Sequence, residues 1–468
     1  MKKKCAIISM AISIILFLIL FIRYDTCQVV KDSLNSLLWI AILINVFCVI
    51  SAILSGMKIY NAYVIYLAMF LIFIFGQIIC RYIFGYTDAR LSYLQIVVKE
   101  ENLKPAIILS TYCLLAMNYG AMLVNSLKRN KKIEVKEVKT KRLKTFAKIL
   151  FICTIPFVVY EFGNKIILAI NGGYKGVYSE VNYGLSSIVE KIIPYFYISL
   201  LLLLYSCRKN VAKSRAILIF IIIYSGIQMV FGARGIVLLQ ILMTIILWCV
   251  AVKKPSKKLI IAMLILIIPV SYIISFVGEM RNYPVAEWGK KIAEGKVLQD
   301  NFILKTINEM GTAIYPTAAS IIVVPEEIPY KYGTTFLAAA TTIIPNLGDG
   351  EHFANKYIKF TSEVAKKFAA PFGGSIVEEG FVNFGWCCPL FFIFFAMGIV
   401  LLEDKIYQLG SKNEIIYPLY IAFVVQLLWT VRNNLAPLII YMIRYIIPVF
   451  ILYLVFIKIY SKKGKRSA

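Results

Sequence analysis

The sequence predicts an all-α fold, a polytopic transmembrane helix bundle. Of its 468 residues, 60% are hydrophobic and the mean hydropathy is +0.78, which is more apolar surface than a water-soluble protein of this size can bury. The apolar residues form long runs with hardly any charge, such as 5–22 and 259–277. A run of about 20 apolar residues crosses the hydrocarbon core of a bilayer. In lipid such a run must be helical, because its backbone N–H and C=O groups need partners within the segment.

About twelve runs are long enough to span a membrane. The first is interpreted as a retained span, because Arg23 and Tyr24 follow it directly and no small-residue cleavage site is present. The predicted spans are 5–22, 37–54, 62–80, 104–125, 147–170, 188–206, 216–231, 235–252, 259–277, 380–402, 415–430 and 436–458.

The positive charge indicates how these spans are oriented. The formal net charge is +26, and the basic residues gather in short loops and at the two ends. Counting spans places all the basic clusters on one side, as the positive-inside rule requires, so both termini are predicted to be cytoplasmic. Anionic lipid explains the charge, and no motif for reading nucleic acid is present. The clusters are 2–4, 128–148, 208–215, 253–258 and 462–466.

The chain therefore divides into three segments. Residues 1–277 carry nine predicted spans, residues 278–379 form a large outer loop, and residues 380–468 carry three spans and a basic tail. Apolar stretches at 311–324 and 334–345 of the loop are too short to span and predict interfacial or re-entrant helices. The ten Cys include no CxxC pair and are interpreted as small hydrophobic residues, so no metal site and no cofactor are predicted.

Arginine is retained on the side where positive charge should be scarce. A guanidinium group suits bidentate contact with phosphate oxygens, which points to a phosphorylated ligand near the outer leaflet. The alternative is snorkelling from helix ends to headgroups, which is preferred for Arg23 and Arg90 and left open for Arg81. The arginines on this side are Arg23, Arg81, Arg90, Arg234, Arg281, Arg432 and Arg444.

Arg234 stands in the sequence FGARG, between two apolar spans joined by almost no loop. Gly232 and Gly235 permit close approach of a ligand to the backbone, and the N-terminus of the following helix favours anions. A glycine-rich hairpin with one solvated charge is the plainer interpretation. The phosphate-binding interpretation is placed modestly ahead of it.

Arg444 is predicted to lie about 12 Å into the last span, at the usual helical rise. A charge at that depth costs several kcal/mol unless it is paired or faces a polar cavity, so it should face the bundle interior. A structural ion pair and a functional role are equally compatible with this position. Arg432 lies about three helical turns away, and the two arginines are predicted to line one groove for a diphosphate.

The stretch 373–385, GGSIVEEGFVNFG, opens the next span with two carboxylates. An acid at a helix N-terminus is favourable for the helix dipole, which by itself accounts for Glu378 and Glu379. The functional alternative is that one of them accepts a proton from an attacking substrate hydroxyl. Asn383 lies four residues after Glu379, on the same helix face, and would orient substrate hydroxyls or satisfy a buried backbone group.

The single histidine, His352, stands in the outer loop beside Asp349 and Glu351. A role as an exposed polar residue is favoured over catalysis, because the spacing of these side chains matches no established cation site. The sequence has no DxD-like pair on the inner side and no Walker motif, so use of ATP or of a sugar nucleotide is not predicted.

Three features resemble the Wzy-type oligosaccharide repeat-unit polymerases of O-antigen and capsule assembly. They are the G-x-R-G turn at 232–235, the glycine-opened apolar stretch 333–345 that ends in proline, and the G-G-S-x-x-x-E-x-x-x-N-F-G stretch at 373–385. With the predicted layout, the resemblance covers most of the chain. It implies a GT-C-like membrane glycosyltransferase that acts without a metal on the outer face of the membrane.

The resemblance also implies substrates, partners and site residues. The enzyme would transfer a growing glycan from undecaprenyl diphosphate to a sugar hydroxyl of one lipid-linked repeat unit, alongside a flippase and a chain-length regulator. Arg234 and Arg432 would hold diphosphate with help from Arg444 or Arg281, and Glu379 would orient or deprotonate the acceptor. Residues implied at the sugars are Asn383, Glu378 and His352.

Two other functions remain open at this point. An O-antigen ligase shares the donor chemistry but would be expected to depend on a catalytic histidine of the outer loop, here His352. A flippase or secondary transporter usually shows internal repeats and ionisable groups near the membrane midplane. The sequence shows no repeat, and its charges concentrate beside the outer loop, so the transporter is ranked lower.

Overall fold

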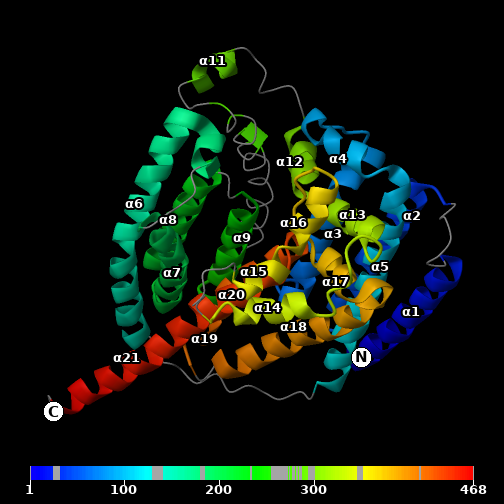
Figure 1. The fold of residues 1–468 in the computed structure, drawn as a ribbon. Helices are drawn as coiled ribbons and strands as arrows, with labels where there is room; N and C mark the ends of the chain where they lie inside the picture. The colour runs from blue at the N-terminus through cyan, green and yellow to red at the C-terminus, as the bar shows by residue number, and fades with distance from the viewer. Residues whose placement is uncertain are drawn as a thin grey trace. The chain divides into compact units, whose positions relative to one another are not determined.

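The computed structural model describes residues 2–24, 32–128, 141–179, 185–231, 234–253, 272, 275–276, 280, 283, 287–293, 301–344, 352–410 and 413–466. Within these ranges the regular structure is helical throughout and contains no strand, which confirms the predicted all-α class (Figure 1). The chain forms two compact units. Unit 1 comprises residues 1–133, 307–405 and 427–440, and unit 2 comprises residues 134–306, 406–426 and 441–468.

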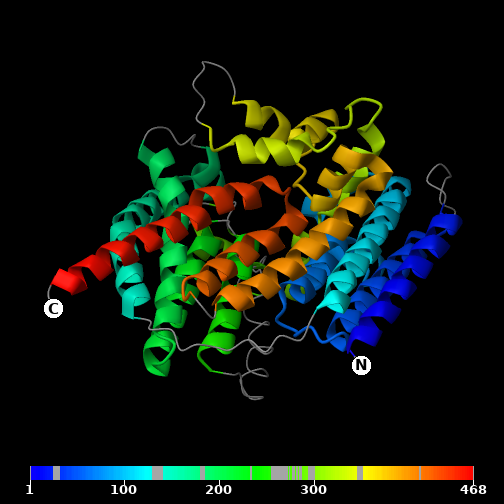
Figure 2. The ribbon, with the colours of Figure 1, turned by 90° about the horizontal axis from the view of Figure 1, so that it is seen from below.

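Unit 1 is built around a long, buried helix, α5. Helices α1 and α2 lie along α5, as the blue and cyan ribbons show in Figure 2, and α13 packs against it as well. The helices wholly within unit 1 are α1 (Lys2–Arg23), α2 (Leu34–Leu54), α3 (Ala62–Tyr82), α4 (Ser92–Val97), α5 (Glu100–Leu127), α13 (Ile314–Val323), α14 (Thr334–Thr341), α15 (Phe353–Ile358), α16 (Phe360–Lys367) and α17 (Ile376–Phe384), with the 3-10 turns η1 (Ala89–Leu91), η3 (Gly385–Cys387) and η4 (Thr430–Arg432).

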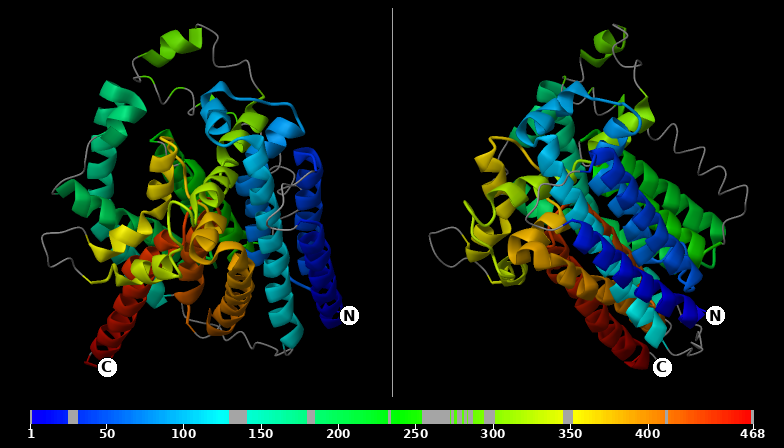
Figure 3. Two further views of the ribbon diagram at one scale, coloured as in Figure 1. Left: turned by 45° about the vertical axis from the view of Figure 1, so that its right-hand side comes forward. Right: turned by 90° about the vertical axis from the view of Figure 1, so that its right-hand side faces the viewer.

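Unit 2 pairs its long helices. Helix α6 packs along α7, and α8 packs along α9, as the green ribbons show in Figure 3. The helices wholly within unit 2 are α6 (Lys141–Ser179), α7 (Leu185–Ser206), α8 (Val211–Val230), α9 (Arg234–Ala251), α11 (Trp288–Ala293), the π-helix η5 (Met442–Ile446) and α21 (Ile447–Arg466). One boundary between the units lies between residues 133 and 134, and the other four fall within α12 (Phe302–Met310), α18 (Cys388–Gly410), α19 (Ile416–Trp429) and α20 (Ala436–Tyr441).

Ten helical segments of the described residues are long and apolar enough to cross a membrane. They correspond to ten of the predicted spans, so the chain is a multi-pass membrane protein. The predicted span 415–430 appears as a shorter apolar segment, Ile416–Arg432. The predicted span 259–277 lies almost wholly outside the described residues.

The two units divide the chain differently from the three segments 1–277, 278–379 and 380–468. Unit 1 combines the first helices with residues 307–405, because α13 packs on α5 and on α17. Both short helices predicted in the loop are present, as α13 and α14. Which side of a membrane these segments face stays a prediction.

The predicted span 380–402 differs from the structure at its start. Ser375 caps a helix that already begins at Ile376, and this helix stops at Gly385 before α18 starts at Cys388. Gly385 has φ +56, and a Cβ there would lie 2.8 Å from the hydroxyl oxygen of Tyr330. The break therefore needs glycine, and it separates the short helix α17, which carries Glu378, Glu379 and Asn383, from the long helix α18.

Candidate functional site

Glu378 closes the first turn of its own helix. Its Oε2 accepts a hydrogen bond from the backbone N–H of Ser375 at 3.1 Å, while Ser375 Oγ accepts from the N–H of Val377 at 3.1 Å. Ser320 and Thr361 donate further hydrogen bonds to the carboxylate, which is fully buried. This is a capping box, a device worth about 1 kcal/mol. The geometry favours the structural interpretation of Glu378.

Glu379 is the next residue, but it binds partners outside its own helix. Thr335 Oγ1, at the start of α14, donates to Oε1 at 2.8 Å, and the backbone N–H of Leu435 donates to Oε2 at 2.6 Å. The side chain has no exposed surface. Both carboxylate oxygens therefore accept hydrogen bonds from within unit 1, and the carboxylate joins α17 to α14 and to the segment that precedes α20.

Asn383 lies one turn after Glu379 on the same face of α17, as its spacing predicts. Its Nδ2 donates to the backbone oxygen of Glu379 and to Thr335 Oγ1, both at 2.8 Å, and its Oδ1 accepts from the N–H of Gly333 at 2.7 Å. The side chain is fully buried. Bonding to a buried backbone group, one of the two roles predicted for Asn383, is thus observed at the backbone oxygen of Glu379, and the same side chain also binds the half-buried N–H of Gly333.

Arg432 ends η4 and is flanked by two anchored positions. Before it, the hydroxyl groups of Thr430 and Tyr66 lie 3.2 Å apart, within hydrogen-bonding distance. After it, residues 433–435 lie against the residues that precede and open α17. Asn434 Nδ2 donates to the backbone oxygen of Ile358 at 3.3 Å, and the N–H of Leu435 is held by Glu379.

The position of Gly374 shows how closely residues 433–435 pack. A Cβ at Gly374 would lie 3.3 Å from the backbone N of Asn434 and 3.4 Å from Cα of Asn433. Arg432 itself is half-buried, and its charge acts on a tyrosine of α4. Burial raises the pKa of Tyr93, and the positive charge of Arg432 lowers that pKa by a smaller amount. Unit 1 thus holds an arginine between fixed backbone positions, beside the polar residues of α17.

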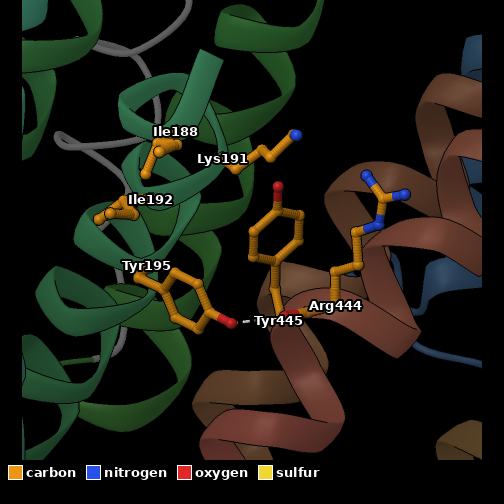
Figure 4. A pocket seen from close by; sticks show the side chains of 6 residues that line it. All are labelled: Ile188, Lys191, Ile192, Tyr195, Arg444 and Tyr445. Carbon is orange, nitrogen blue, oxygen red and sulfur yellow. Dashed lines mark hydrogen bonds between the residues drawn. The ribbon is translucent and has the colours of Figure 1, made fainter. Parts of the chain in front are cut away.

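Unit 2 contains a pocket of about 400 Å³ beside the π-helix Met442–Ile446. Figure 4 shows its lining side chains, which come from α7 and η5 and are Ile188, Lys191, Ile192, Tyr195, Arg444 and Tyr445. The ammonium group of Lys191, the hydroxyl of Tyr445 and the guanidinium group of Arg444 point to the same end of the pocket. Two cations and a hydroxyl at one end, with isoleucines beside them, suit an anionic group that carries an apolar tail.

The backbone of Arg444, within the π-helix, is bound by a side chain of α7. The hydroxyl of Tyr195 donates to the backbone oxygen of Arg444 at 2.6 Å, and the rings of Tyr195 and Tyr445 meet edge to face at 5.1 Å. Among the described residues no carboxylate pairs with the Arg444 guanidinium group, so the ion pair considered from the sequence is not observed there. Single-turn π-helices often mark functional sites. The side chain of Arg444 is exposed at this pocket, whereas its depth in the span predicts a position in the bundle interior.

Arg234 lies at the N-terminus of α9 in unit 2 and is half-buried. The helix begins one residue earlier than predicted, at Arg234 rather than Gly235. On the two sides of the preceding turn, Met229 of α8 and Val237 of α9 are buried in one hydrophobic cluster, as a tight hairpin requires. Gly232 lies outside the described residues. The structure describes Arg234 and Arg444 in unit 2 and Arg432 in unit 1, so a shared groove for Arg432 and Arg444 stays a prediction.

His352 caps a short helix. Its Nδ1 accepts a hydrogen bond from the N–H of Ala354 at 3.0 Å, and its Nε2 lies 2.8 Å from the backbone oxygen of Ile344. Both ring nitrogens are thus engaged within unit 1, in agreement with the plainer interpretation. Asp349 and Glu351 lie outside the described residues. Among the described residues, no three or more His, Cys, Asp or Glu side chains gather closely enough to hold a metal ion.

The remaining arginines of the predicted outer side differ in their contacts. Arg23 forms an ion pair with Asp32 at 2.8 Å, and Arg90 pairs with Asp88 and Glu309. These contacts are with carboxylates of the chain, so the snorkelling to headgroups preferred for both arginines stays a prediction. Arg81 stacks over the ring of Tyr82, 5.2 Å from its centroid. Arg281 lies outside the described residues.

Several residues of these sites were not identified from the sequence. Lys191 could have been identified, because it is a charged residue within the predicted span 188–206, and so could Thr335, which lies two residues after the glycine that opens the stretch 333–345. Leu435 could not have been identified, because it contributes only its backbone N–H. Tyr195 and Tyr445 belong to a chain with 30 tyrosines, where one more tyrosine in a helix is not distinctive.

Comparison with protein families gives one match, and it covers nearly the whole chain. A family model described as O-antigen polysaccharide polymerase Wzy matches residues 7–465. No curated protein and no solved structure matches the chain. The matched range includes the polar network around Glu379, the residues from Gly374 to Leu435, and the pocket of Lys191 and Arg444.

Proposed function

Because the chain belongs to the O-antigen polysaccharide polymerase Wzy family, we propose that it polymerises undecaprenyl-diphosphate-linked oligosaccharide repeat units into a surface polysaccharide. The family acts on lipid-linked repeat units in membranes. The family match over residues 7–465 is the observation that carries the proposal. The site would lie on the outer face of a bacterial inner membrane.

The proposed layout is a GT-C-like bundle of about twelve spans with both termini in the cytoplasm. Ten candidate spans and the shorter apolar segment Ile416–Arg432 support it. The residue range 259–277 would supply the twelfth span. The basic clusters of the short loops would then all face the cytoplasm.

The arginines would serve the diphosphate. Arg432 in unit 1 and Arg234 and Arg444 in unit 2 are proposed to contact phosphate oxygens, with Arg281 assisting. We add Lys191, whose ammonium group points to the same end of the pocket as the Arg444 guanidinium group (Figure 4). Negative charge on the diphosphate leaving group rises in the transition state, so cations already in place stabilise that state more than the bound substrate. This charge stabilisation does not require a metal ion.

The acceptor side is proposed to involve residues of α17 and the loop before it. Glu379 was predicted to orient or deprotonate the acceptor hydroxyl, and Glu378, Asn383 and His352 to contact sugars. In the structure each of these side chains already bonds within unit 1, so a sugar hydroxyl would have to replace one of its present partners. A flippase would deliver the units, and a chain-length regulator would set the product length.

The test is glycan length in a host that lacks its own polymerase and makes the matching repeat unit. Wild type, Arg234→Ala and Arg432→Ala are compared, with Arg23→Ala as the control, since Arg23 is an arginine at a helix end that pairs with Asp32. Membrane expression of each variant is measured by immunoblot. We expect a glycan ladder from wild type and Arg23→Ala, and single capped repeats from the other two.

The proposal is wrong if wild type gives no ladder while lipid-linked single units accumulate on the inner face. That outcome would favour transport of the repeat unit. A ladder from all four proteins would support the polymerase but remove the two arginines from its site.

A further inference from the structure

We propose that Glu379 is a positioning residue that holds Arg432 in place through the backbone of residues 433–435. The inference rests on the proposed function only in taking Arg432 as a phosphate ligand. The contact on which it depends, from Glu379 to Leu435, lies within unit 1 and can be measured without any glycan.

The contact is short and buried. A carboxylate oxygen and a backbone N–H lie 2.6 Å apart, and the Glu379 side chain has no exposed surface. Hydrogen bonds to an ionised acceptor are about twice as strong as neutral ones, and more so away from water. The N–H of Leu435 has no acceptor within a helix. Leu435 directly precedes α20, and the first N–H groups of a helix have no partner inside that helix.

The contact between Glu379 and Leu435 can fix the position of Arg432, because the chain between Arg432 and Leu435 is short. Two residues separate Arg432 from Leu435, and consecutive residues reach at most about 3.6 Å each. The other side of Arg432 is held at Thr430, which lies beside the hydroxyl of Tyr66. Between the two fixed points, a Cβ at Gly374 would lie 3.3 Å from the backbone N of Asn434, so a larger residue there would displace this backbone by a few tenths of an ångström. Release of Leu435 would remove the C-terminal fixed point and leave the backbone after Arg432 held only by the Asn434 side chain and by this packing.

The same geometry argues against Glu379 as the proton acceptor. A general base must lie about 2.6–3.2 Å from the atom whose proton it takes. Oε1 already accepts from Thr335 and Oε2 from Leu435, and Asn383 closes the network by donating to Thr335. A substrate hydroxyl would have to break one of these bonds in the buried interior.

Two substitutions separate positioning from proton transfer. Glu379→Gln keeps one oxygen to accept from the N–H of Leu435 and places its amide N–H opposite Thr335 Oγ1, which can accept. Glu379→Ala removes both contacts. If Glu379 positions Arg432, Glu379→Gln polymerises within about threefold of wild type, whereas Glu379→Ala loses a factor of about 10–100, as loss of a charge-assisted hydrogen bond does. If Glu379 is the base, both variants lose about 10²–10⁴.

Hydrogen exchange of the purified protein measures the contact directly. Peptides that cover residues 433–436 are expected to exchange faster in Glu379→Ala than in wild type or Glu379→Gln. Glu378→Gln is the matched control for this measurement, because Glu378 is equally buried on the same helix and bonds to Ser375 instead of Leu435. Unchanged exchange in folded Glu379→Ala would overturn the proposal.

A double-mutant cycle with Arg432→Ala tests whether the effect passes through Arg432. The rate at which two repeat units are joined in membranes is measured, because it detects transfer that is too slow to give a ladder. If the effect passes through Arg432, adding Glu379→Ala to Arg432→Ala lowers this rate by less than about threefold. Losses that multiply would overturn the positioning role, as would a full loss in folded Glu379→Gln. If wild type makes no polymer, the proposed function is wrong. Hydrogen exchange still shows in that case whether Glu379 holds the backbone of residues 433–435.

Discussion

The backbone N–H of Leu435 donates a hydrogen bond of 2.6 Å to Oε2 of Glu379, which stands 56 positions earlier in the chain. This bond joins the start of α17 to the segment behind Arg432. The neighbouring Glu378 caps its own helix, so two adjacent carboxylates have different structural roles. Four further predictions follow from the geometry of the two units.

The first prediction concerns the pocket of unit 2. Arg444→Ala and Lys191→Ala are each expected to lower the polymerisation rate about 10- to 100-fold, because a charged hydrogen bond contributes about 1.5–3 kcal/mol. Arg444→Lys should recover only part of the loss, since an ammonium group cannot contact two phosphate oxygens in one plane. The measurement is the rate of polymer formation in membranes with equal amounts of each variant.

The control for this pocket is Lys213→Ala, which removes an exposed lysine at the start of α8 in the same unit. Its rate should equal that of wild type. Wild-type rates in both Arg444→Ala and Lys191→Ala would show that the pocket binds no phosphate of the reacting lipids.

The second prediction concerns the stability contributed by Asn383. Asn383→Ala leaves the N–H of Gly333 and the hydroxyl of Thr335 short of a partner, and should lower the free energy of unfolding by about 1–3 kcal/mol. Thermal unfolding in detergent measures this as a lower Tm. Asn355→Ala, at an exposed position of α15, should change the free energy of unfolding by less than about 0.5 kcal/mol. Equal Tm values for the two variants would show that the hydrogen bonds of Asn383 do not stabilise the fold.

The third prediction concerns the cap of α17. Ser375→Ala removes the acceptor for the N–H of Val377 and should cost about 0.5–2 kcal/mol of unfolding free energy, whereas Ser375→Gly should cost only a few tenths. Urea unfolding in mild detergent compares the two variants. A cost for Ser375→Gly as large as that for Ser375→Ala would mean that the hydroxyl cap is not the stabilising contact.

The fourth prediction uses His352 to separate polymerase from ligase. In a polymerase whose His352 caps α15, His352→Ala weakens the cap and lowers the amount of polymer, but a glycan ladder still forms. His352→Asn, which keeps an acceptor at the cap, should restore the amount. Complete loss of transfer in His352→Ala and His352→Asn, with activity retained in Glu379→Ala, would instead favour an O-antigen ligase.

Much of the fold was predictable because its signal is local. Ten predicted spans appear as helices long enough to cross a membrane, since run length and apolarity alone determine that a segment is helical in lipid. The shared face of Glu379 and Asn383 followed from a four-residue spacing. The break at Gly385 was not predicted, because one glycine in an apolar stretch does not by itself show where a helix stops, and the close approach of Tyr330 to that glycine exists only in the folded chain.

The sequence by itself determined the all-α class, the apolar spans and the motif-bearing stretches, because each is encoded in neighbouring residues. Only the tertiary structure decided what the site residues contact. Glu379 binds a backbone N–H that any residue at position 435 except proline would offer, and Lys191 lines the same pocket as Arg444 from a different helix. Such contacts arise when segments far apart in the chain pack together, so they leave no pattern in the local sequence.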